Sequence, residues 1–482
     1  MIGTLSVIWL LPLVGAVLVA FMPPRFAKYM SVLVSLAALV VAAFVAFAFA
    51  PDYHRFQFDE VLPWIPQLHV FYRLGVDGIS LWLVVLNAFL TTIAVLATPI
   101  GTKNVSRFLA LMLAMSAGMA GVLMATDLVL FYVFWEAMLI PAYFLLWLFG
   151  EGDRPGRAAL KFVLYTLAGS LLMLVGVIGE YVFTGQQTFD LAKLPAIAPS
   201  SGIQFGLFFV FAIAFAIKTP LFPFHGWIPD AYAAAPAPML VTFAGMMGKT
   251  GAYGFLRIAI PLFPDPTGLW DWRWVVPVLA VGGILWGALM ALAQRDMKML
   301  VAYSSISHMG FIVLGIFSLN VQGQQGAVLQ MVNHGVIISA LFLLVAWIQD
   351  RTGSRDRSSV FGLAPRMPIF AGVFTVVTLA ALGLPGLNSF VGEFMTLLGA
   401  WQLAPWLAIA GAVGLVLTPV YMLRFFQGAM YAEKPFDRPV DDIYVSQLSL
   451  LAPLVLLMFA IGLAPGVLTA LMTSVAQQGL AR

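Results

Sequence analysis

Long apolar runs separated by short polar stretches dominate this chain. A bilayer core needs about 20 apolar residues per helix, and 14 runs meet that length. They lie near residues 3–22, 28–50, 77–99, 107–126, 128–149, 158–183, 203–235, 237–260, 274–294, 298–318, 325–349, 367–400, 403–427 and 446–472. The pattern predicts an all-α polytopic membrane protein with about 14 transmembrane helices.

Two of the predicted helices are over-long and interrupted. The seventh contains Pro220 and Pro223, which remove backbone donors and break the helical ladder. The twelfth contains the run Gly383-Leu384-Pro385-Gly386. The two breaks are five helices apart, and an odd offset reverses direction through the membrane. This is the pattern of an inverted repeat, with helices 4–8 mirrored by helices 9–13, and paired breaks of this kind point to the ion site.

The repeat predicts four regions along the chain. They are 1–106 with the first three helices and an outside loop at 51–76, 107–260 with the first five-helix repeat, 274–427 with the second, inverted repeat, and 446–482 with the last helix. Aromatic residues of the outside loop are expected to form a cap or an interfacial belt: Phe56, Phe58, Trp64 and Phe71.

The distribution of basic residues predicts the orientation. Sixteen lysines and arginines fall in loops after odd-numbered helices, and only five fall in loops after even-numbered ones. Because cytoplasmic loops are enriched in lysine and arginine, the odd-numbered loops are expected on the cytoplasmic side and both termini on the outer side.

Composition agrees with a membrane protein and excludes several functions. The 482 residues are 62% hydrophobic and 9% charged, whereas soluble domains carry about 25% charged residues. The net charge of +3 is too small and too scattered to indicate nucleic-acid binding. The chain has no cysteine, which excludes disulfides, cysteine-ligated iron–sulfur clusters and thiolate zinc sites. It also has no nucleotide-binding or hydrolase motif.

Six titratable residues lie inside apolar runs and are the primary site candidates: Glu136, Lys218, Lys249, His308, His334 and Glu393. Ionisable groups at membrane depth are costly, so they usually face a polar interior and mark an ion path. Each has a bland alternative, such as a neutral interior glutamate, a lysine whose ammonium reaches the interface, or a hydrogen-bonded core histidine.

Lys218 immediately precedes the first break, and Glu136 is its expected partner across the bundle. Burial disfavours the charged form of either group, whereas an opposite charge nearby favours it. Moving Glu136 away would therefore release the proton of Lys218, and restoring Glu136 would reload it. The pair is predicted to act as a switch.

The remaining candidates are expected to form a relay. Lys249 is flanked by glycines, which permit close helix approach and leave room for water. His308 and His334 can shuttle protons near neutral pH. Glu393 follows the second break, where Asn388 and Ser389 add polar groups.

Weaker candidates lie nearby. His225 and Asp230 are closer to the cytoplasmic end and could help proton uptake, although an interfacial turn around Pro229 explains them equally well. Tyr303 and Ser304 are further secondary candidates for the proton path, and no metal site is expected.

Several motifs give the sequence a specific resemblance: FYVFWEAMLIPAY, IKTPLFPFHGWIPDAY, MGKTGAYGFLR, KMLVAYSSISHMGF, MVNHG and GLPGLNSFVGEF. Across essentially its whole length the chain resembles the antiporter-like membrane subunits of respiratory complex I (NADH–quinone oxidoreductase). It is most similar to the M type, because related L-type, N-type and Mrp chains usually have lysine where this chain has Glu393. One departure is Gly226, where many members have threonine.

The resemblance implies a proton-translocating subunit that carries no redox centre. Glu136 and Lys218 would be the regulating ion pair, Lys249, His308 and His334 the central hydrated axis, and Glu393 the connection to the outer side. FMN, iron–sulfur clusters and quinone would bind other subunits. The expected partners are L-type and N-type antiporter-like chains, small membrane subunits, the lipid bilayer, protons and water. The expected location is a bacterial plasma (inner) membrane, with a thylakoid membrane as the alternative.

Other functions stay open at this point. The first is an Mrp-type Na⁺/H⁺ antiporter subunit, and the second is a ferredoxin- or F420H₂-linked relative of complex I. The third is a structural subunit needed only for assembly. The fourth is a b-type cytochrome in which two histidines on separate spans ligate a haem.

Overall fold

The structure is a computed structural model, which describes residues 3–50, 56–268, 273–431, 436 and 439–480. The first part of the predicted outside loop, residues 51–55, lies outside these ranges. Within them, eleven helices are long and apolar enough to cross a membrane, and two shorter apolar helices are Thr4–Ala20 and Pro368–Ala381. The predicted all-α membrane fold is confirmed, and the helices are compatible with the predicted 14 spans.

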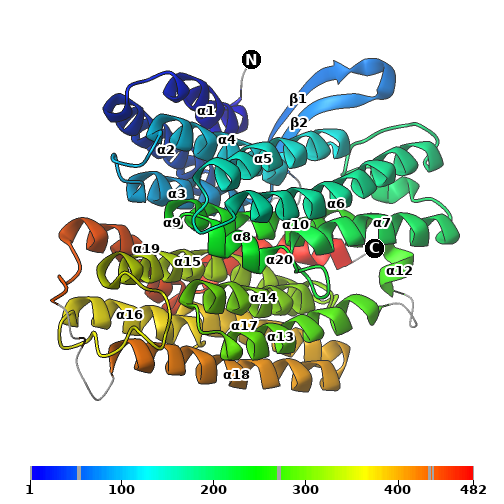
Figure 1. Ribbon diagram of the computed structural model, residues 1–482. Helices are drawn as coiled ribbons and strands as arrows, with labels where there is room; N and C mark the ends of the chain where they lie inside the picture. The colour runs from blue at the N-terminus through cyan, green and yellow to red at the C-terminus, as the bar shows by residue number, and fades with distance from the viewer. Residues whose placement is uncertain (1–2, 51–55, 269–272, 432–435, 437–438, 481–482) are drawn as a thin grey trace. The chain divides into compact units, whose positions relative to one another are not determined.

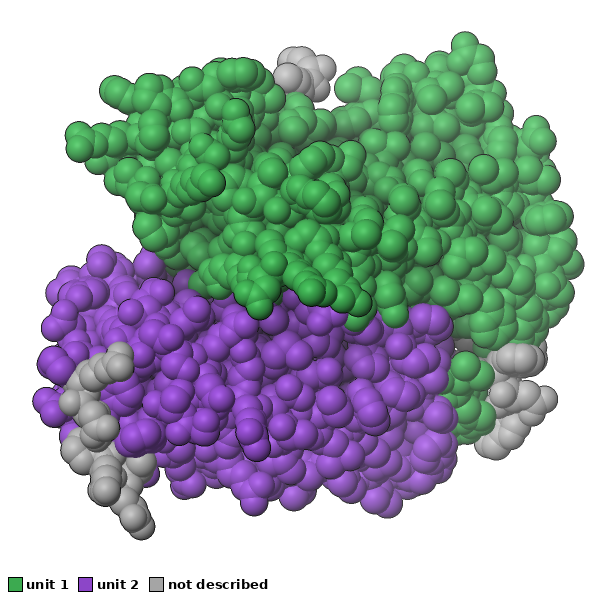
Figure 2. All heavy atoms as spheres, viewed as in Figure 1, with its two compact units in different colours: residues 1–220, 234–275, 470–482 green, residues 221–233, 276–469 purple. Residues whose placement is uncertain are grey.

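The chain forms two compact units, coloured separately in Figure 2. Unit 1 comprises residues 1–220, 234–275 and 470–482, and unit 2 comprises residues 221–233 and 276–469. The predicted grouping into two inverted five-helix repeats stays a prediction.

Unit 1 begins with six apolar helices (Figure 1): α1 (Thr4–Ala20), α2 (Pro24–Phe47), α3 (Ser80–Ala97), α4 (Val105–Met124), α5 (Leu128–Phe149) and α6 (Pro155–Phe183). α4 packs against α1, α3 and α5, and most of its residues are buried. The helix α7 (Ser201–Lys218) follows and packs against α6. Lys218 is therefore the last residue of a helix inside this bundle.

A two-stranded antiparallel hairpin, which the sequence pattern did not predict, occupies most of the outside loop. It consists of β1 (Gln57–Ile65) and β2 (Val70–Val76), joined by a short 3-10 turn, η1 (Pro66–Leu68), and Glu60 pairs with Leu74. Side chains anchor it to the bundle. Asp127, which caps the start of α5, accepts a hydrogen bond from the Phe71 amide, and Arg73 forms an ion pair with Asp190.

The seventh predicted helix is broken as expected. α7 ends at Lys218, and the short helix α8 (Ile228–Ala234) begins only after Pro220 and Pro223. Proline lacks the amide hydrogen that the helical ladder requires, so the chain leaves the helix directly after the lysine. The first stretch of unit 1 ends at Pro220, and α8 belongs almost entirely to unit 2.

The eighth predicted helix is a continuous helical segment of mixed winding. It runs through α9 (Ala237–Thr242), the π-helical turn η3 (Phe243–Met247), α10 (Gly248–Gly254), the π-helical turn η4 (Phe255–Ala259) and α11 (Ile260–Leu262). Lys249 lies in α10, between the two π turns. Such turns are rare and often mark functional positions. The short helix α12 (Pro264–Gly268) follows this segment. A further 3-10 turn, η2 (Leu194–Ile197), lies earlier in the chain, between α6 and α7.

Unit 2 is built around α15 (Val321–Thr352), whose most apolar window is 94% buried. It packs against α14 (Met297–Ile316), α16 (Pro368–Ala381), α17 (Asn388–Leu403) and α19 (Val445–Leu463). The remaining helices of this unit are α13 (Val275–Ala293) and α18 (Pro405–Met430), whereas α20 (Gly466–Leu480) belongs mostly to unit 1. The predicted fourteenth segment thus contains α19 and the start of α20.

The twelfth predicted helix is also broken where expected. α16 ends at Ala381 and α17 begins at Asn388. Gly383 and Gly386 in the break have φ values of 76° and 93°. These lie in the left-handed region, which glycine adopts readily and residues with a Cβ rarely adopt. The break places the start of α17, and with it Glu393, next to α15.

Candidate functional site

In unit 1, Lys218 is buried at the end of α7. Its ammonium lies over two aromatic rings, 5.4 Å from the centroid of Trp135 and 5.9 Å from that of Phe162. It has no hydrogen-bond partner among the described residues. Aromatic faces attract a cation, so these rings supply part of the stabilisation that hydrogen bonds do not.

Glu136 is half-buried on α5, one residue after Trp135. The Tyr132 hydroxyl, one turn earlier, hydrogen-bonds to its carboxylate. The charge of Glu136 acts electrostatically on Lys218, but no hydrogen bond joins the two groups. The structure therefore brings the predicted partners within electrostatic range without direct contact.

Lys249 is fully buried in α10, and its ammonium donates a hydrogen bond to the Ala244 carbonyl oxygen at 2.8 Å. That carbonyl belongs to the π turn η3. Gly251, two residues after Lys249, lies directly on the first break: a Cβ there would be 2.5 Å from the Thr219 Oγ1 and 2.7 Å from its backbone nitrogen. The glycine thus lets the segment that carries Lys249 pack against the residue that follows Lys218.

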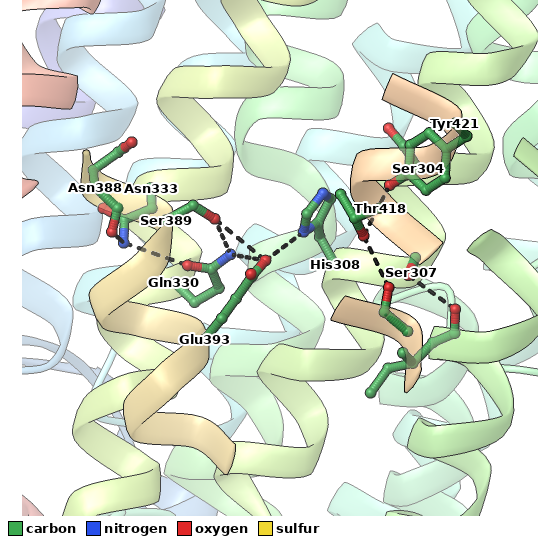
Figure 3. A network of polar contacts seen from close by, with 12 residues as sticks. Ser304, Ser307, His308, Gln330, Asn333, Asn388, Ser389, Glu393, Thr418 and Tyr421 are labelled. Atoms are coloured by element: carbon green, nitrogen blue, oxygen red, sulfur yellow. Dashed lines mark hydrogen bonds and ion pairs between the residues drawn. The ribbon is translucent and has the colours of Figure 1, made fainter. Parts of the chain in front are cut away.

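In unit 2, the His308 ring on α14 contacts Glu393 on α17 (Figure 3), with 2.8 Å between Nδ1 and the carboxylate Oε1. The same Oε1 accepts hydrogen bonds from the Gln330 amide at 3.0 Å and the Ser389 hydroxyl at 3.2 Å. Glu393, Gln330 and Ser389 are all buried. A titratable pair is thereby held within an enclosed polar cluster at the second break.

This cluster continues through two asparagines. The Asn333 side-chain nitrogen donates to the Asn388 carbonyl oxygen at 2.7 Å and to the Gln330 side-chain oxygen at 3.4 Å. On α15, His334 lies beside Asn333, and its ring centroid is 5.7 Å from that of His308. Three of the six primary candidates, His308, His334 and Glu393, are therefore assembled in unit 2.

Further hydroxyl groups lie near the same region of unit 2. The Tyr421 hydroxyl on α18 hydrogen-bonds to Ser304 and, at 3.4 Å, to Thr418. The Ser307 hydroxyl donates to the Ile284 carbonyl oxygen at 2.9 Å. Ser304, a secondary candidate, is thus part of a buried chain of hydroxyl groups.

The other secondary candidates occupy different surroundings. His225 stacks on the Phe222 ring, with 5.5 Å between centroids, and lies near Trp286. Asp230 is exposed in the first turn of α8. Tyr303 is half-buried on α14, where its carbonyl lies against Gly287.

The sequence pattern did not single out four of these polar residues: Gln330, Asn333, Thr418 and Tyr421. Their signal was weak because amides and hydroxyls occur in many spans without function. Glu180, near the C-terminal end of α6, is a weaker candidate for the proton path. It is fully buried, and neither carboxylate oxygen has a hydrogen-bond partner among the described residues. The pair Gln330 and Asn333, three residues apart on one face of an apolar helix, is the clearest signal that could have been used.

Comparison with known proteins gives a consistent result. Residues 125–418 match the family described as NADH:quinone oxidoreductase/Mrp antiporter, TM. Subunit M of NADH-quinone oxidoreductase from Mycobacterium tuberculosis is 39% identical over 505 aligned positions, covering 96% of this chain and 91% of the relative. A chain of respiratory complex I from Thermus thermophilus with bound NADH is 33% identical, with a TM-score of 0.90 and 99% of both chains covered.

A more distant structure shares only the fold. A chain of the Mrp complex from Dietzia sp. DQ12-45-1b has 22% identity and a TM-score of 0.86, with 99% of this chain and 97% of that chain covered. All six primary candidates lie within the range that matches the family, and the resemblance to complex I antiporter-like subunits is confirmed. The chain belongs to the NADH:quinone oxidoreductase/Mrp antiporter transmembrane family.

Proposed function

We propose that this chain is a proton-translocating, antiporter-like subunit in the membrane arm of a complex I-type NADH:quinone oxidoreductase. The M-type relative and the complex I chain support the assignment by identity and by coverage. The observation that carries the mechanism is the Glu393–His308 contact of 2.8 Å, buried at the second helix break. Two groups that both exchange protons are held together there.

In unit 1, Glu136 sets the proton affinity of Lys218. With an effective dielectric constant near 20, a charge roughly 5–10 Å away contributes about 2–3 kcal/mol. That corresponds to a change of roughly 20- to 250-fold in proton affinity. A movement of Glu136 toward Lys218 therefore loads the proton, and a movement away releases it. The Trp135 and Phe162 rings partly stabilise the charged ammonium at either position of Glu136.

In unit 2, His308, His334 and Glu393 pass the proton toward the outer side. An imidazole ring is suited to this step because it can take up a proton on one ring nitrogen and release it from the other. His225 and Asp230 assist uptake at the cytoplasmic side, with Tyr303 and Ser304 as further participants. Lys249, held by the π turn η3, is the intermediate carrier.

We further propose the setting in which this path operates. The chain is an integral membrane protein; a bacterial plasma membrane with both termini on the outer side fits its basic loops. L-type and N-type antiporter-like chains and small membrane subunits are its partners. FMN, iron–sulfur clusters and quinone bind elsewhere in the complex, which agrees with a chain that has no cysteine.

The test is proton pumping by the assembled complex in proteoliposomes, measured per NADH oxidised. Glu136→Gln and Lys218→Ala are both expected to abolish pumping and coupled quinone reduction, because each removes one side of the switch. The Lys249→Ala variant distinguishes a role of Lys249 in the proton path from a role in the assembly of the complex. If that complex assembles normally and pumps at the native rate, Lys249 is not a carrier. Full pumping by the Glu136 or Lys218 variant would refute the proposed mechanism.

An Mrp-type Na⁺/H⁺ antiporter subunit is the second candidate, since the matching family description includes Mrp antiporters and the Dietzia structure shares the fold. Purification of the native complex decides between them. Co-purified flavin and iron–sulfur subunits support the respiratory assignment, and Na⁺-dependent H⁺ exchange without such subunits supports the antiporter.

A further inference from the structure

We infer that Gln330 and Ser389 are positioning residues that fix where protons can bind in the Glu393–His308 pair. They make Glu393 Oε1 an acceptor only and hold the neutral His308 ring with its proton on Nδ1. Glu393 Oε2 and His308 Nε2 are then the atoms that exchange protons. This inference rests on the proposed proton path and specifies its chemistry.

A contact with the backbone fixes the orientation of the Asn333 side chain. This side chain contacts the Asn388 carbonyl oxygen at 2.7 Å. A backbone carbonyl oxygen can only accept hydrogen bonds, so the atom of Asn333 that faces it must be the NH₂ group. The same NH₂ group faces the Gln330 side chain at 3.4 Å, and this contact requires the oxygen of Gln330 at that position.

The orientation of Gln330 follows from that of Asn333. With its oxygen toward Asn333, Gln330 directs its NH₂ group toward Ser389 Oγ at 2.9 Å and Glu393 Oε1 at 3.0 Å. An amide NH₂ group has two hydrogens, one for each contact. Ser389 Oγ therefore accepts from Gln330, and its own hydrogen is directed to Glu393 Oε1 at 3.2 Å.

The hydrogen bonds to Glu393 then determine which nitrogen of His308 carries the proton. Oε1 already accepts two hydrogen bonds when the His308 Nδ1 contact of 2.8 Å is added. If Nδ1 were the acceptor, Oε1 would carry the proton, donate it to the ring and still accept from two donors. The carbonyl oxygen, which is the better acceptor, would then be Oε2, and Oε2 has no partner among the described residues. With Nδ1–H as donor, Oε1 accepts three hydrogen bonds and does not have to donate one while accepting two others.

The position of Oε2 supports this division of roles. Its neighbour in the second break is Gly383, where a Cβ would lie 3.1 Å from Oε2. The absence of a side chain there leaves Oε2 facing the break, where the helical ladder is open. Oε1, in contrast, is enclosed by α14, α15 and α17. A proton therefore reaches and leaves Glu393 through Oε2 at the break, whereas the contact between Oε1 and His308 Nδ1 holds the two proton-exchanging groups together.

The experiment measures the His308 tautomer in the assembled complex, with ring-labelled histidine and vibrational or solid-state NMR difference spectra. Subtraction of the spectrum of a His308→Asn complex isolates the His308 signal, at a pH where the ring is neutral. The wild type is expected to carry the proton on Nδ1. In Gln330→Leu the ratio of Nδ1–H to Nε2–H is expected to fall about tenfold, or about 1.4 kcal/mol.

Gln324→Leu is the matched control, because Gln324 is a buried amide of the same helix outside this cluster. It is expected to leave the tautomer ratio unchanged. If Gln330→Leu does not assemble, Ser389→Ala removes one donor and is expected to lower the ratio by a smaller factor. An Nε2–H tautomer in the wild type, an imidazolium at every accessible pH, or an unchanged ratio in the variants overturns the inference. If the tautomer ratio shifts in the variants but pumping is unchanged, the role of Gln330 and Ser389 is supported and the proposed proton path is contradicted.

Discussion

Gly383 in the second break allows the role of Glu393 to be tested without changing the carboxylate. Its φ of 76° is left-handed, and a Cβ would lie 3.1 Å from Glu393 Oε2. Gly386, three residues later, has a φ of 93° but no atom within 4 Å of the same position. The two alanine variants therefore share a backbone cost and differ in their contact with Glu393.

The magnitudes follow from these geometries. A left-handed alanine costs roughly 1–2 kcal/mol, so both variants are expected to lose about that much stability. Only Gly383→Ala also places a methyl group against Oε2, where it blocks the approach of a proton donor or acceptor. Loss of one hydrogen bond to a charged group costs about 1.5–3 kcal/mol, which would slow proton transfer roughly 10- to 150-fold.

The assay compares the initial pumping rate per NADH oxidised in proteoliposomes, with thermal inactivation of the same preparations as the measure of stability. Gly383→Ala is expected to lose most of its pumping, whereas Gly386→Ala is expected to retain it at similar stability. Equal pumping in the two variants, whether both are high or both low, would show that Oε2 is not the atom that exchanges protons.

Three further predictions concern unit 1. Trp135→Leu removes the ring under the Lys218 ammonium, which should weaken proton retention by about 1–2 kcal/mol and shift the pH optimum of pumping downward; an unshifted optimum would contradict the contact with the cation. Asp77→Asn breaks a buried ion pair with Arg257, in which 2.6 Å separates the charged atoms, and should lower the free energy of unfolding by about 3–5 kcal/mol. The control Asp59→Asn, in the more exposed pair with Arg73, should cost about 0–1 kcal/mol. Equal losses in thermal unfolding would contradict a stabilising role of the buried pair. Burial raises the pKa of Asp127, which caps α5 outside the membrane span, to about 6. Because the folded protein binds this proton more tightly than the unfolded chain, the contribution of Asp127 to stability is most favourable below pH 4. It declines by about 3 kcal/mol as the pH rises to 6, and Asp127→Asn should remove this decline in melting curves.

The sequence alone determined the class of protein and the position of its breaks. Apolar length and proline or glycine chemistry are local properties, so Pro220, Pro223 and Gly383 predicted both interruptions without any knowledge of packing. An ionisable residue at membrane depth can likewise be recognised from the sequence alone. This property identified Lys218, Lys249, His308 and Glu393 because an ionisable group in an apolar run is rare whatever the fold.

Tertiary structure decided which of these groups meet and through which atoms. A helical sequence does not state which face packs against which neighbour, so Gln330 and Asn333 gained significance only when α15 was seen against α17. Likewise, Glu136 and Lys218 interact through space without a hydrogen bond. The π turns around Lys249 also depend on packing, because local propensity favours an ordinary α-helix there. The hairpin β1–β2 depends on packing as well, because strand propensity is strongly context-dependent. Charge and hydrophobicity fix how deep a residue lies, whereas the partners of each polar atom depend on contacts between segments far apart in the chain.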